Sequence, residues 1–439
     1  MKFTKYDYIL YTMTIAENPY ITYDLYHKQK LVALASSHKR DGANYILCGG
    51  PGGGGKTRCL AALALQFITE PHYRCLVTRE KYRELIGPGS VFDIIKSVEG
   101  LKVRESSPIR VVAPSGAEIH FKAFNDSTHK EDVRGESYHT IINDEASRLE
   151  EDVLRYLNRS LRKPANDPLP LRFINASNPG GPSTDYLVNK YINGEYPYVE
   201  MGYRDNPFID TEQYEEALME LDYIDRQYQM YGNWFYKPSV GDLINRDEME
   251  KQYITSPKYH TQYNIISIDL AGKGKDSFAV VSYSLLQNGW EYIEDFAQTK
   301  SSYPEDMLID FVAKHNPRRG SPRTSVIVIE QEGGGSPEYA RKYFQNELED
   351  FGIPVVLKKP KGSKYQRARP LMRDIQHGKT KLNKDGDYMD DFIQESIELD
   401  PEGKGKSPNL VDSASLARNY LHEKVMGSKT RFIKGRRIG

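Results

Sequence analysis

A glycine-rich stretch, residues 50–57, could bind a polyphosphate; it reads Gly-Pro-Gly-Gly-Gly-Gly-Lys-Thr. Glycines let a backbone wrap around phosphate groups with its N–H groups pointing inward. In a P-loop of this pattern Lys56 would reach the β- and γ-phosphates, and the Thr57 hydroxyl would bind Mg²⁺. A flexible turn is the alternative, but a plain linker would not supply the terminal Gly-Lys-Thr. The sequence therefore predicts nucleotide contacts from Gly50, Gly52, Gly53, Gly54, Gly55, Lys56 and Thr57.

A P-loop hydrolyses ATP only with an acid that holds Mg²⁺ and a group that activates or positions water. Residues 139–145 read His-Thr-Ile-Ile-Asn-Asp-Glu, an apolar run that ends in two acids. We expect Asp144 to hold the metal and Glu145 to polarise the attacking water. The alternative is a strand followed by an acidic helix cap. Asn143 is irregular, because a fully buried strand would prefer an apolar residue there.

Two further segments could serve the same nucleotide. Gln29 lies upstream of the strand that precedes the P-loop, where an amide could read the adenine edge, although a lone Gln is usually a surface residue. Ser177 and Asn178 follow another expected strand, and such small polar residues can sense the γ-phosphate and transmit its loss. An ordinary Asn-Pro turn is the alternative for this second segment.

Acids also end the apolar strands expected in the second half of the chain. Asp269 and Glu330 each follow such a run, Glu332 comes two residues later, and Asp412 begins a candidate helix. Converging acids repel one another unless divalent cations compensate their charge. Two Mg²⁺ or Mn²⁺ ions held by such acids is the arrangement for in-line phosphodiester hydrolysis. Each acid alone could equally end a strand and face water.

Two sheets are needed to position these residues. In the first half, short β-like runs alternate with helical stretches, which predicts a mostly parallel sheet covered by helices; the runs are 44–48, 74–78, 118–121, 139–143 and 172–175. A β-rich pattern begins near residue 263, and its three successive strands indicate the antiparallel start of an RNase H-like, mixed sheet. We therefore predict an α/β chain with an ATPase domain at 1–235, a linker at 236–256, a nuclease domain at 257–425 and a basic tail at 426–439.

Composition sets wider limits on the chain. Its 439 residues favour two domains. A net charge of −1 does not by itself indicate nucleic-acid binding, although the tail is basic. The three cysteines are too few for a disulfide framework and are expected to be buried in a reducing cytosol. No apolar run approaches the roughly 18 residues of a membrane span, and the N-terminus lacks the apolar core of a signal peptide.

In this order the motifs resemble those of the large terminase subunit of tailed bacteriophages, an ATP-driven DNA-packaging motor with a nuclease. The resemblance spans residues 20–421. Gln29 is similar to the adenine-motif glutamine of this family, residues 50–57 to Walker A, Asp144 with Glu145 to Walker B, and residues 177–179 to the coupling motif. Residues 205–207 and 232–234 resemble the signature that ends the ATPase. The nuclease pattern is matched, in order, by Asp269, residues 330–333, Lys364, Arg367 and Asp412.

The chain departs from the family at a few positions. Relatives often carry a basic residue inside the P-loop where this chain has Gly52, and Arg79 after the next strand is the candidate substitute. Paired aspartates often stand at the last nuclease position, but only Asp412 is present here, so Asp276 is a further candidate metal ligand. Strand-end geometry favours Glu330 over Glu332 as the main second ligand, and the choice stays open.

The resemblance implies an ASCE-type P-loop ATPase joined to an RNase H-like nuclease, with ATP and Mg²⁺ at the first site and Mg²⁺ or Mn²⁺ at the second. Arg134 is similar to the arginine that this family contributes in trans to a neighbouring ATP site. The implied partners are double-stranded DNA, a portal protein, a small terminase subunit and further copies in a ring, although the free chain could be a monomer. No membrane is implied, and the expected location is the host cytoplasm during phage assembly.

Two other functions compete with this interpretation. A helicase-nuclease of DNA repair would unwind strands, but the further helicase motifs expected after Pro179 are missing. A P-loop switch or scaffold with a catalytically dead, DNA-binding second domain would use ATP only slowly and would not cleave DNA.

Overall fold

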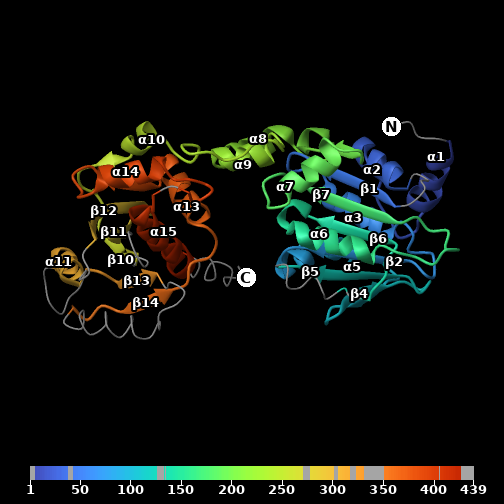
Figure 1. Ribbon diagram of the computed structural model, residues 1–439, viewed down its shortest axis with the longest axis horizontal. Helices are drawn as coiled ribbons and strands as arrows, with labels where there is room; N and C mark the ends of the chain where they lie inside the picture. The colour runs from blue at the N-terminus through green and yellow to red at the C-terminus, as the bar shows by residue number, and fades with distance from the viewer. Residues whose placement is uncertain are drawn as a thin grey trace, which may run out of the picture. The chain divides into compact units, whose positions relative to one another are not determined.

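The computed structural model describes residues 5–37, 43–125, 133, 135–269, 277–300, 305–316, 323–330, 351–404 and 406–426. The chain divides into two compact units, each with one large sheet (Figure 1). Unit 1 comprises Met1–Leu221 and Asp225–Tyr236, and unit 2 comprises Asp222–Ile224 and Lys237–Gly439. The stretch expected as a linker, 236–256, carries helix α10 (Arg246–Glu250) and strand β9 (Tyr253–Ile254).

The sheet of unit 1 has the strand order β3-β4-β5-β2-β6-β7-β1-β8 among the described residues. Strands from β5 to β8 in this order run parallel, while β3 and β4 add an antiparallel edge. Their bounds are β1 Asn44–Gly49, β2 Arg74–Arg79, β3 Lys102–Arg104, β4 Ile109–Val112, β5 Glu118–Ala123, β6 Thr140–Asp144, β7 Arg172–Ser177 and β8 Tyr198–Glu200. The parallel direction brings the P-loop, Arg79, Asp144 and Ser177 to the same sheet edge.

Helices cover both faces of this sheet, as an α/β arrangement predicts. In β1, Ile46 and Cys48 pack in one cluster with α2, α3 and α5, whereas Leu47 packs on the other face with α6. Strands β2, β6 and β7 alternate in the same way. The helices before residue 190 are α1 Lys5–Tyr11, α2 His27–Ser37, α3 Lys56–Leu65, α4 Tyr82–Ile86, α5 Val91–Lys96, α6 Glu151–Leu157 and α7 Thr184–Leu187. Two later helices are α8 Thr211–Met219, whose Leu218 packs in a separate small cluster, and α9 Tyr223–Gln229. The three cysteines are free and buried.

The sheet of unit 2 is mixed, with the order β14-β13-β10-β11-β12-β15-β9 among the described residues. Strands β10, β11 and β12 are antiparallel neighbours, while β13 and β14 continue from β10 in the parallel direction. This is the RNase H-like arrangement that the sequence predicts. The strands are β10 Thr261–Asp269, β11 Phe278–Leu286, β12 Glu291–Thr299, β13 Val326–Glu330, β14 Val355–Lys358 and β15 Thr380–Asn383.

The two faces of the second sheet are covered by different helices (Figure 1). Helix α11 (Glu305–His315) packs on alternate residues of β10 and β13, such as Ile268 and Ile329. Helix α15 (Asn409–Leu421) packs against β10 and β11, and α13 (Lys364–Gln376) packs on α15. Helix α14 (Met389–Ile397) precedes α15 in the chain. Within the described ranges, no helix is long and apolar enough to cross a membrane.

Candidate active sites

The P-loop connects β1 to the start of α3, as the strand–loop–helix pattern predicts. Gly50, Gly53 and Gly55 have φ values of 121°, 71° and 67°, a region that L side chains rarely adopt. Lys56 Nζ donates to the Pro51 carbonyl at 2.7 Å, so the ammonium lies over the loop that would hold the phosphates. Burial lowers the pKa of Lys56, and the nearby Glu145 carboxylate opposes part of this shift.

Gln29 lies against the P-loop from α2. Its Nε2 donates to the Gly55 carbonyl at 3.0 Å, and its Oε1 accepts from the Tyr26 backbone N–H at 3.1 Å. The Tyr26 hydroxyl in turn donates to the Gly54 carbonyl at 2.5 Å. Gln29 is buried and both ends of its amide bind protein, so in this structure it supports the shape of the loop. A contact between Gln29 and adenine stays a prediction.

Asp144 and Glu145 lie where β6 ends, at the same sheet edge as the P-loop. Arg79, from the end of neighbouring β2, donates Nη1 to Asp144 Oδ2 at 2.8 Å. Burial raises the pKa of Asp144 to about 6, although Arg79 opposes the shift. Glu145 has φ 55° and ψ 47°, a left-handed conformation that costs a non-glycine residue roughly 1–2 kcal/mol. Such strain is typical of functional sites.

Asn143, the irregular residue of this strand, is part of a buried ladder across three strands. Its Nδ2 donates to Asn175 Oδ1 at 2.8 Å, and its Oδ1 accepts from Thr78 Oγ1 at 2.7 Å. Asn175 Nδ2 donates to the Tyr191 hydroxyl at 2.7 Å. The amide is therefore satisfied by neighbouring strands, which explains why a polar residue stands in the centre of the sheet.

The predicted coupling residues are linked to the P-loop through Gln229 at the end of α9. Asn178 Nδ2 donates to Gln229 Oε1 at 2.5 Å, and the Gly52 backbone N–H donates to the Gln229 carbonyl at 2.7 Å. The Ser177 hydroxyl is 2.8 Å from Ser147 Oγ, which follows Glu145 closely in the chain. Asn178 Oδ1 is buried without a hydrogen-bond partner among the described residues. One residue, Gln229, thus contacts both the loop and the coupling motif.

Aromatic and amide side chains from residues 198–234 pack over the glycine loop. A Cβ on Gly52 would lie 2.8 Å from the Tyr214 hydroxyl, which explains why this chain has no basic side chain there. Asn206 Nδ2 donates to the Gly53 carbonyl at 2.8 Å, and Trp234 lies 2.6 Å from the position of a Cβ on Gly49. The family signature indicated the segment, but no local signal indicated Tyr214 or Gln229.

The second site forms where β10, β13 and α15 meet in unit 2. Residues Ile268 and Ile329 are register partners, so Asp269 and Glu330 end adjacent parallel strands. Arg367 donates to Glu330 Oε1 at 3.1 Å and to Asp412 Oδ1 at 2.8 Å. All three acids are buried. The structure therefore brings together the three carboxylates that the sequence placed in the nuclease.

Two cations from α13 face this cluster of carboxylates. Lys364 Nζ lies 2.7 Å from Asp412 Oδ2, and both Lys364 and Arg367 also interact electrostatically with Asp269. Burial raises the pKa of Glu330, and the Asp412 charge adds to that rise. Buried carboxylate oxygens that already attract cations are also the donors that Mg²⁺ and Mn²⁺ prefer. The residues present therefore fit a divalent metal.

Three predicted residues, Arg134, Asp276 and Glu332, lie outside the described residues. A fourth acid, Glu395 on α14, was not predicted. Its Oε2 accepts from the Leu410 backbone N–H at 2.8 Å at the start of α15, and burial raises its pKa to about 7. No motif marks Glu395, because its role depends on how α14 packs on α15.

A separate group formed by Glu291, Asp374 and His422 has metal-ligand residue types, and its ligand atoms lie within 4.8 Å of one another. This group lies away from the nuclease acids, because Glu291 of β12 pairs with Leu285 near the end of β11, whereas Phe278 begins β11 on the side of Asp269. Arg418 donates Nη2 to Asp374 Oδ2 at 2.6 Å, and His422 lies 2.7 Å from Glu291. These contacts already satisfy the acids, so we interpret the group as an internal ion network.

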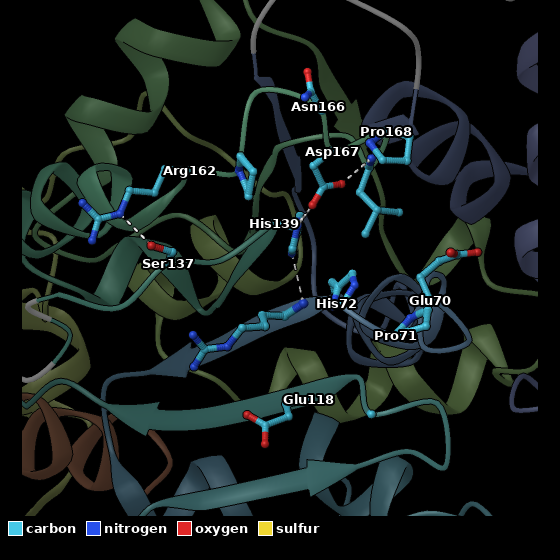
Figure 2. A pocket seen from close by; sticks show the side chains of 14 residues that line it. Glu70, Pro71, His72, Glu118, Ser137, His139, Arg162, Asn166, Asp167 and Pro168 are labelled. Carbon is cyan, nitrogen blue, oxygen red and sulfur yellow. Dashed lines mark hydrogen bonds and ion pairs between the residues drawn. The ribbon is translucent and has the colours of Figure 1, made fainter.

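A cavity of about 720 Å³ opens at the edge of the first sheet where β2, β5 and β6 begin, opposite the P-loop edge (Figure 2). His139 and Asp167 point toward one another there, with His139 Nε2 2.8 Å from Asp167 Oδ2. The Arg74 backbone N–H donates to His139 Nδ1 at 3.1 Å. Both ring nitrogens therefore have protein partners, and these contacts hold His139 in the wall of the cavity.

Comparisons with known proteins bear on the family and the fold of the chain. Residues 47–309, more than half of the chain, match the family described as terminase large subunit, T4likevirus-type, N-terminal. The fold is similar to the large terminase of a thermophilic bacteriophage, with 14% identity, a TM-score of 0.67, and coverage of 92% of this chain and 100% of that chain. The large terminase of the same phage in complex with ATP-gamma-S gives 16% identity and a TM-score of 0.64 at the same coverage.

No curated protein sequence matches the chain. The structural likeness supports the fold, and the family match covers the P-loop, Asp144 and Glu145 at the end of β6, and the first predicted nuclease acid. The order of motifs, the two sheets and this match lead to one assignment: the chain belongs to the family of terminase large subunits.

Proposed function

We propose that the chain is the motor subunit of a DNA-packaging machine, which hydrolyses ATP to translocate double-stranded DNA into a procapsid and cuts concatemeric DNA with its nuclease. The observation that carries the proposal is the presence of two complementary sites in one chain. A P-loop with Asp144 and Glu145 occupies one sheet edge, and Asp269, Glu330 and Asp412 converge at another. Family membership supports the same combination.

At the first site the loop N–H groups and Lys56 would bind the phosphates of ATP. Thr57 and Asp144 would hold Mg²⁺, which when bound neutralises phosphate charge. Glu145 would accept hydrogen bonds from the attacking water and orient it toward the γ-phosphate. Its fixed left-handed backbone keeps the carboxylate at the end of β6. Arg134 of a neighbouring copy would stabilise charge on the γ-phosphate, a contribution on the order of 10³–10⁵ in rate.

Loss of the γ-phosphate would change the position of Ser177 and Asn178. Because Asn178 contacts Gln229, and Gln229 also holds Gly52, a shift of the coupling motif would reach α9 and the P-loop together. Helix α9 ends only a few residues before the boundary of unit 1 at Tyr236. This arrangement would convert hydrolysis into movement of one unit against DNA, whose grip should be sequence-independent and salt-sensitive.

At the second site Asp269, Glu330 and Asp412 would hold divalent metal, Mg²⁺ or Mn²⁺, which when bound activates water and stabilises the phosphodiester. Glu332 and Asp276 are candidates to complete the set. The partners that we propose are a portal protein, a small terminase subunit and further copies of this chain in a ring, in the cytoplasm of the host.

The ATPase half is tested by steady-state hydrolysis with the full chain. Glu145→Gln should bind ATP but lose hydrolysis by at least about 10²-fold, because it keeps the size and removes the carboxylate. Glu99→Gln, an exposed change in the same unit, is the matched control. Hydrolysis that survives Glu145→Gln at the control rate would refute the assignment.

The nuclease half is tested by plasmid cleavage with Mn²⁺ and an EDTA control. Asp269→Asn should abolish cleavage, while Asp391→Asn, an exposed change on α14, should not. Equal cleavage by both variants would exclude the proposed metal site.

A strand-displacement assay separates the motor from a helicase-nuclease, which would unwind a forked duplex. A non-cleaving switch would fail the plasmid assay and allow only single-turnover ATP use.

A further inference from the structure

Two of the three carboxylates of the second site are joined by one guanidinium. Arg367 contacts Glu330 with Nη1 at 3.1 Å and Asp412 with Nη2 at 2.8 Å, so it bridges two elements of the site. Lys364, one helical turn earlier on α13, takes the other oxygen of Asp412 at 2.7 Å. The side chain of Asp412 is 1% exposed and that of Arg367 is 13% exposed. The acids therefore hold cations that belong to the protein itself.

This pairing has a physical cost and a consequence. Buried carboxylates without a counter-ion are strongly unfavourable, so Arg367 and Lys364 stabilise the cluster. The same oxygens are the ones that a divalent metal would need. A metal that binds Glu330 Oε1 or Asp412 Oδ1 therefore competes with Arg367, and the displaced guanidinium then needs another anion.

A cavity of about 190 Å³ next to the bridge offers the place for such an anion. Its lining includes Glu330 and Arg367, and also Lys358, Lys359 and Lys361, which end and follow β14. Lys358 is paired with Glu423, which also lines the cavity, at 2.6 Å. The lining contains four cationic side chains and two carboxylates, so positive charge is in excess. Its size admits a phosphate group with part of a sugar, but not a whole duplex.

We propose that a backbone phosphate of the DNA strand binds in this cavity and takes over Arg367 from Glu330 and Asp412, so that DNA and divalent metal bind the nuclease cooperatively. The inference rests on the proposed nuclease function. Planar guanidinium binds phosphate as well as carboxylate in a bidentate manner, which makes the exchange chemically matched. Cooperative binding is reciprocal: if DNA strengthens metal binding, metal must strengthen DNA binding by the same factor.

The experiment measures Mn²⁺ binding by the full chain, from the electron paramagnetic resonance signal of free Mn²⁺, with and without a short phosphorothioate duplex. We expect the duplex to strengthen Mn²⁺ binding by wild-type protein by at least about tenfold, because a cation a few ångströms away costs several RT. Arg367→Gln should bind Mn²⁺ at least about tenfold more tightly without DNA and gain little from DNA. Arg373→Gln, on the same helix about 9 Å further along its axis, is the matched control.

If Arg367→Gln fails to fold, the double variant Lys359→Gln/Lys361→Gln tests the cavity from its exposed rim. It should lose most of the effect of the duplex on Mn²⁺ binding. The same Mn²⁺ affinity with and without DNA, in a wild-type protein that cleaves plasmid, would overturn the inference and leave the nuclease standing. A wild-type protein that neither binds Mn²⁺ nor cleaves DNA would instead overturn the proposed nuclease itself.

Discussion

The contact between the glycine loop and α8 makes a quantitative prediction about Gly52. A Cβ at this position would lie 2.8 Å from the Tyr214 hydroxyl, 3.2 Å from Gln229 Oε1 and 3.5 Å from the Gln229 carbonyl. The φ angle of Gly52 is not among the positive values, so its backbone accepts a side chain. Gly52→Ala should therefore lower stability mainly because of the crowding by Tyr214, with a smaller effect from Gln229 Oε1.

Two opposing effects set the magnitude. Overpacking costs typically about 1–3 kcal/mol, while replacing glycine by alanine at a permitted backbone gains about 0.4–1 kcal/mol from the unfolded chain. Gly52→Ala should thus destabilise unit 1 by roughly 1–2 kcal/mol. In a Tyr214→Phe background the nearest remaining contacts are 3.2 and 3.5 Å, so the same change should become neutral or slightly stabilising.

The assay is urea unfolding followed by tryptophan fluorescence. The chain has two tryptophans, Trp234 in unit 1 and Trp290 in unit 2. A Trp290→Phe background leaves buried Trp234 as the reporter of unit 1, which avoids treating a two-unit chain as one transition. The four variants form a double-mutant cycle. A coupling energy below about 0.5 kcal/mol, with equal destabilisation in both backgrounds, would refute the steric explanation of Gly52.

Three further predictions concern stability. Glu145→Gly should stabilise unit 1 by roughly 1 kcal/mol, because it relieves the left-handed backbone, while ATP hydrolysis is lost; a destabilised variant would contradict the strain. Asn143→Ala should cost roughly 1–3 kcal/mol in the Trp234 assay, since it removes the Asn143 partner of the buried Thr78 hydroxyl and of Asn175 Oδ1; a change within error would contradict the ladder. Burial lowers the pKa of His315, but the carboxylates of Asp295 and Glu294 favour the charged ring more strongly, so the net pKa is raised. The stabilisation of unit 2 by the charged His315 ring should be present below pH 6.5 and lost as pH rises through the raised pKa. His315→Gln should reduce the pH dependence of unfolding, followed by Trp290 fluorescence, and an unchanged pH profile would contradict this prediction.

The sequence could predict the features whose causes are local. The P-loop, the acids of β6 and the acids that end β10 and β13 each carry a pattern of residue types, and strand direction then brings them to common edges. What it could not predict depends on distant packing. Tyr214 and Gln229 reach the loop from more than a hundred residues away, and Glu395 caps α15 only because α14 lies beside it. Asn143 looked irregular because its partners come from neighbouring strands.

Both sites hold their buried acids in ion pairs with arginine, but the two arginines differ in the other anions that they can reach. Arg79 contacts Asp144 and also Glu84, through Nε at 3.3 Å. Glu84 lies outside the metal site, so Arg79 would keep one carboxylate partner when Asp144 binds metal. Within the described part of the chain, both acids that Arg367 contacts belong to the metal cluster itself. Release of Arg79 therefore needs no substrate, whereas release of Arg367 needs an anion from outside. Mg²⁺ and ATP should accordingly load the first site without DNA, while the second site should bind its metal more tightly in the presence of the strand that it cuts.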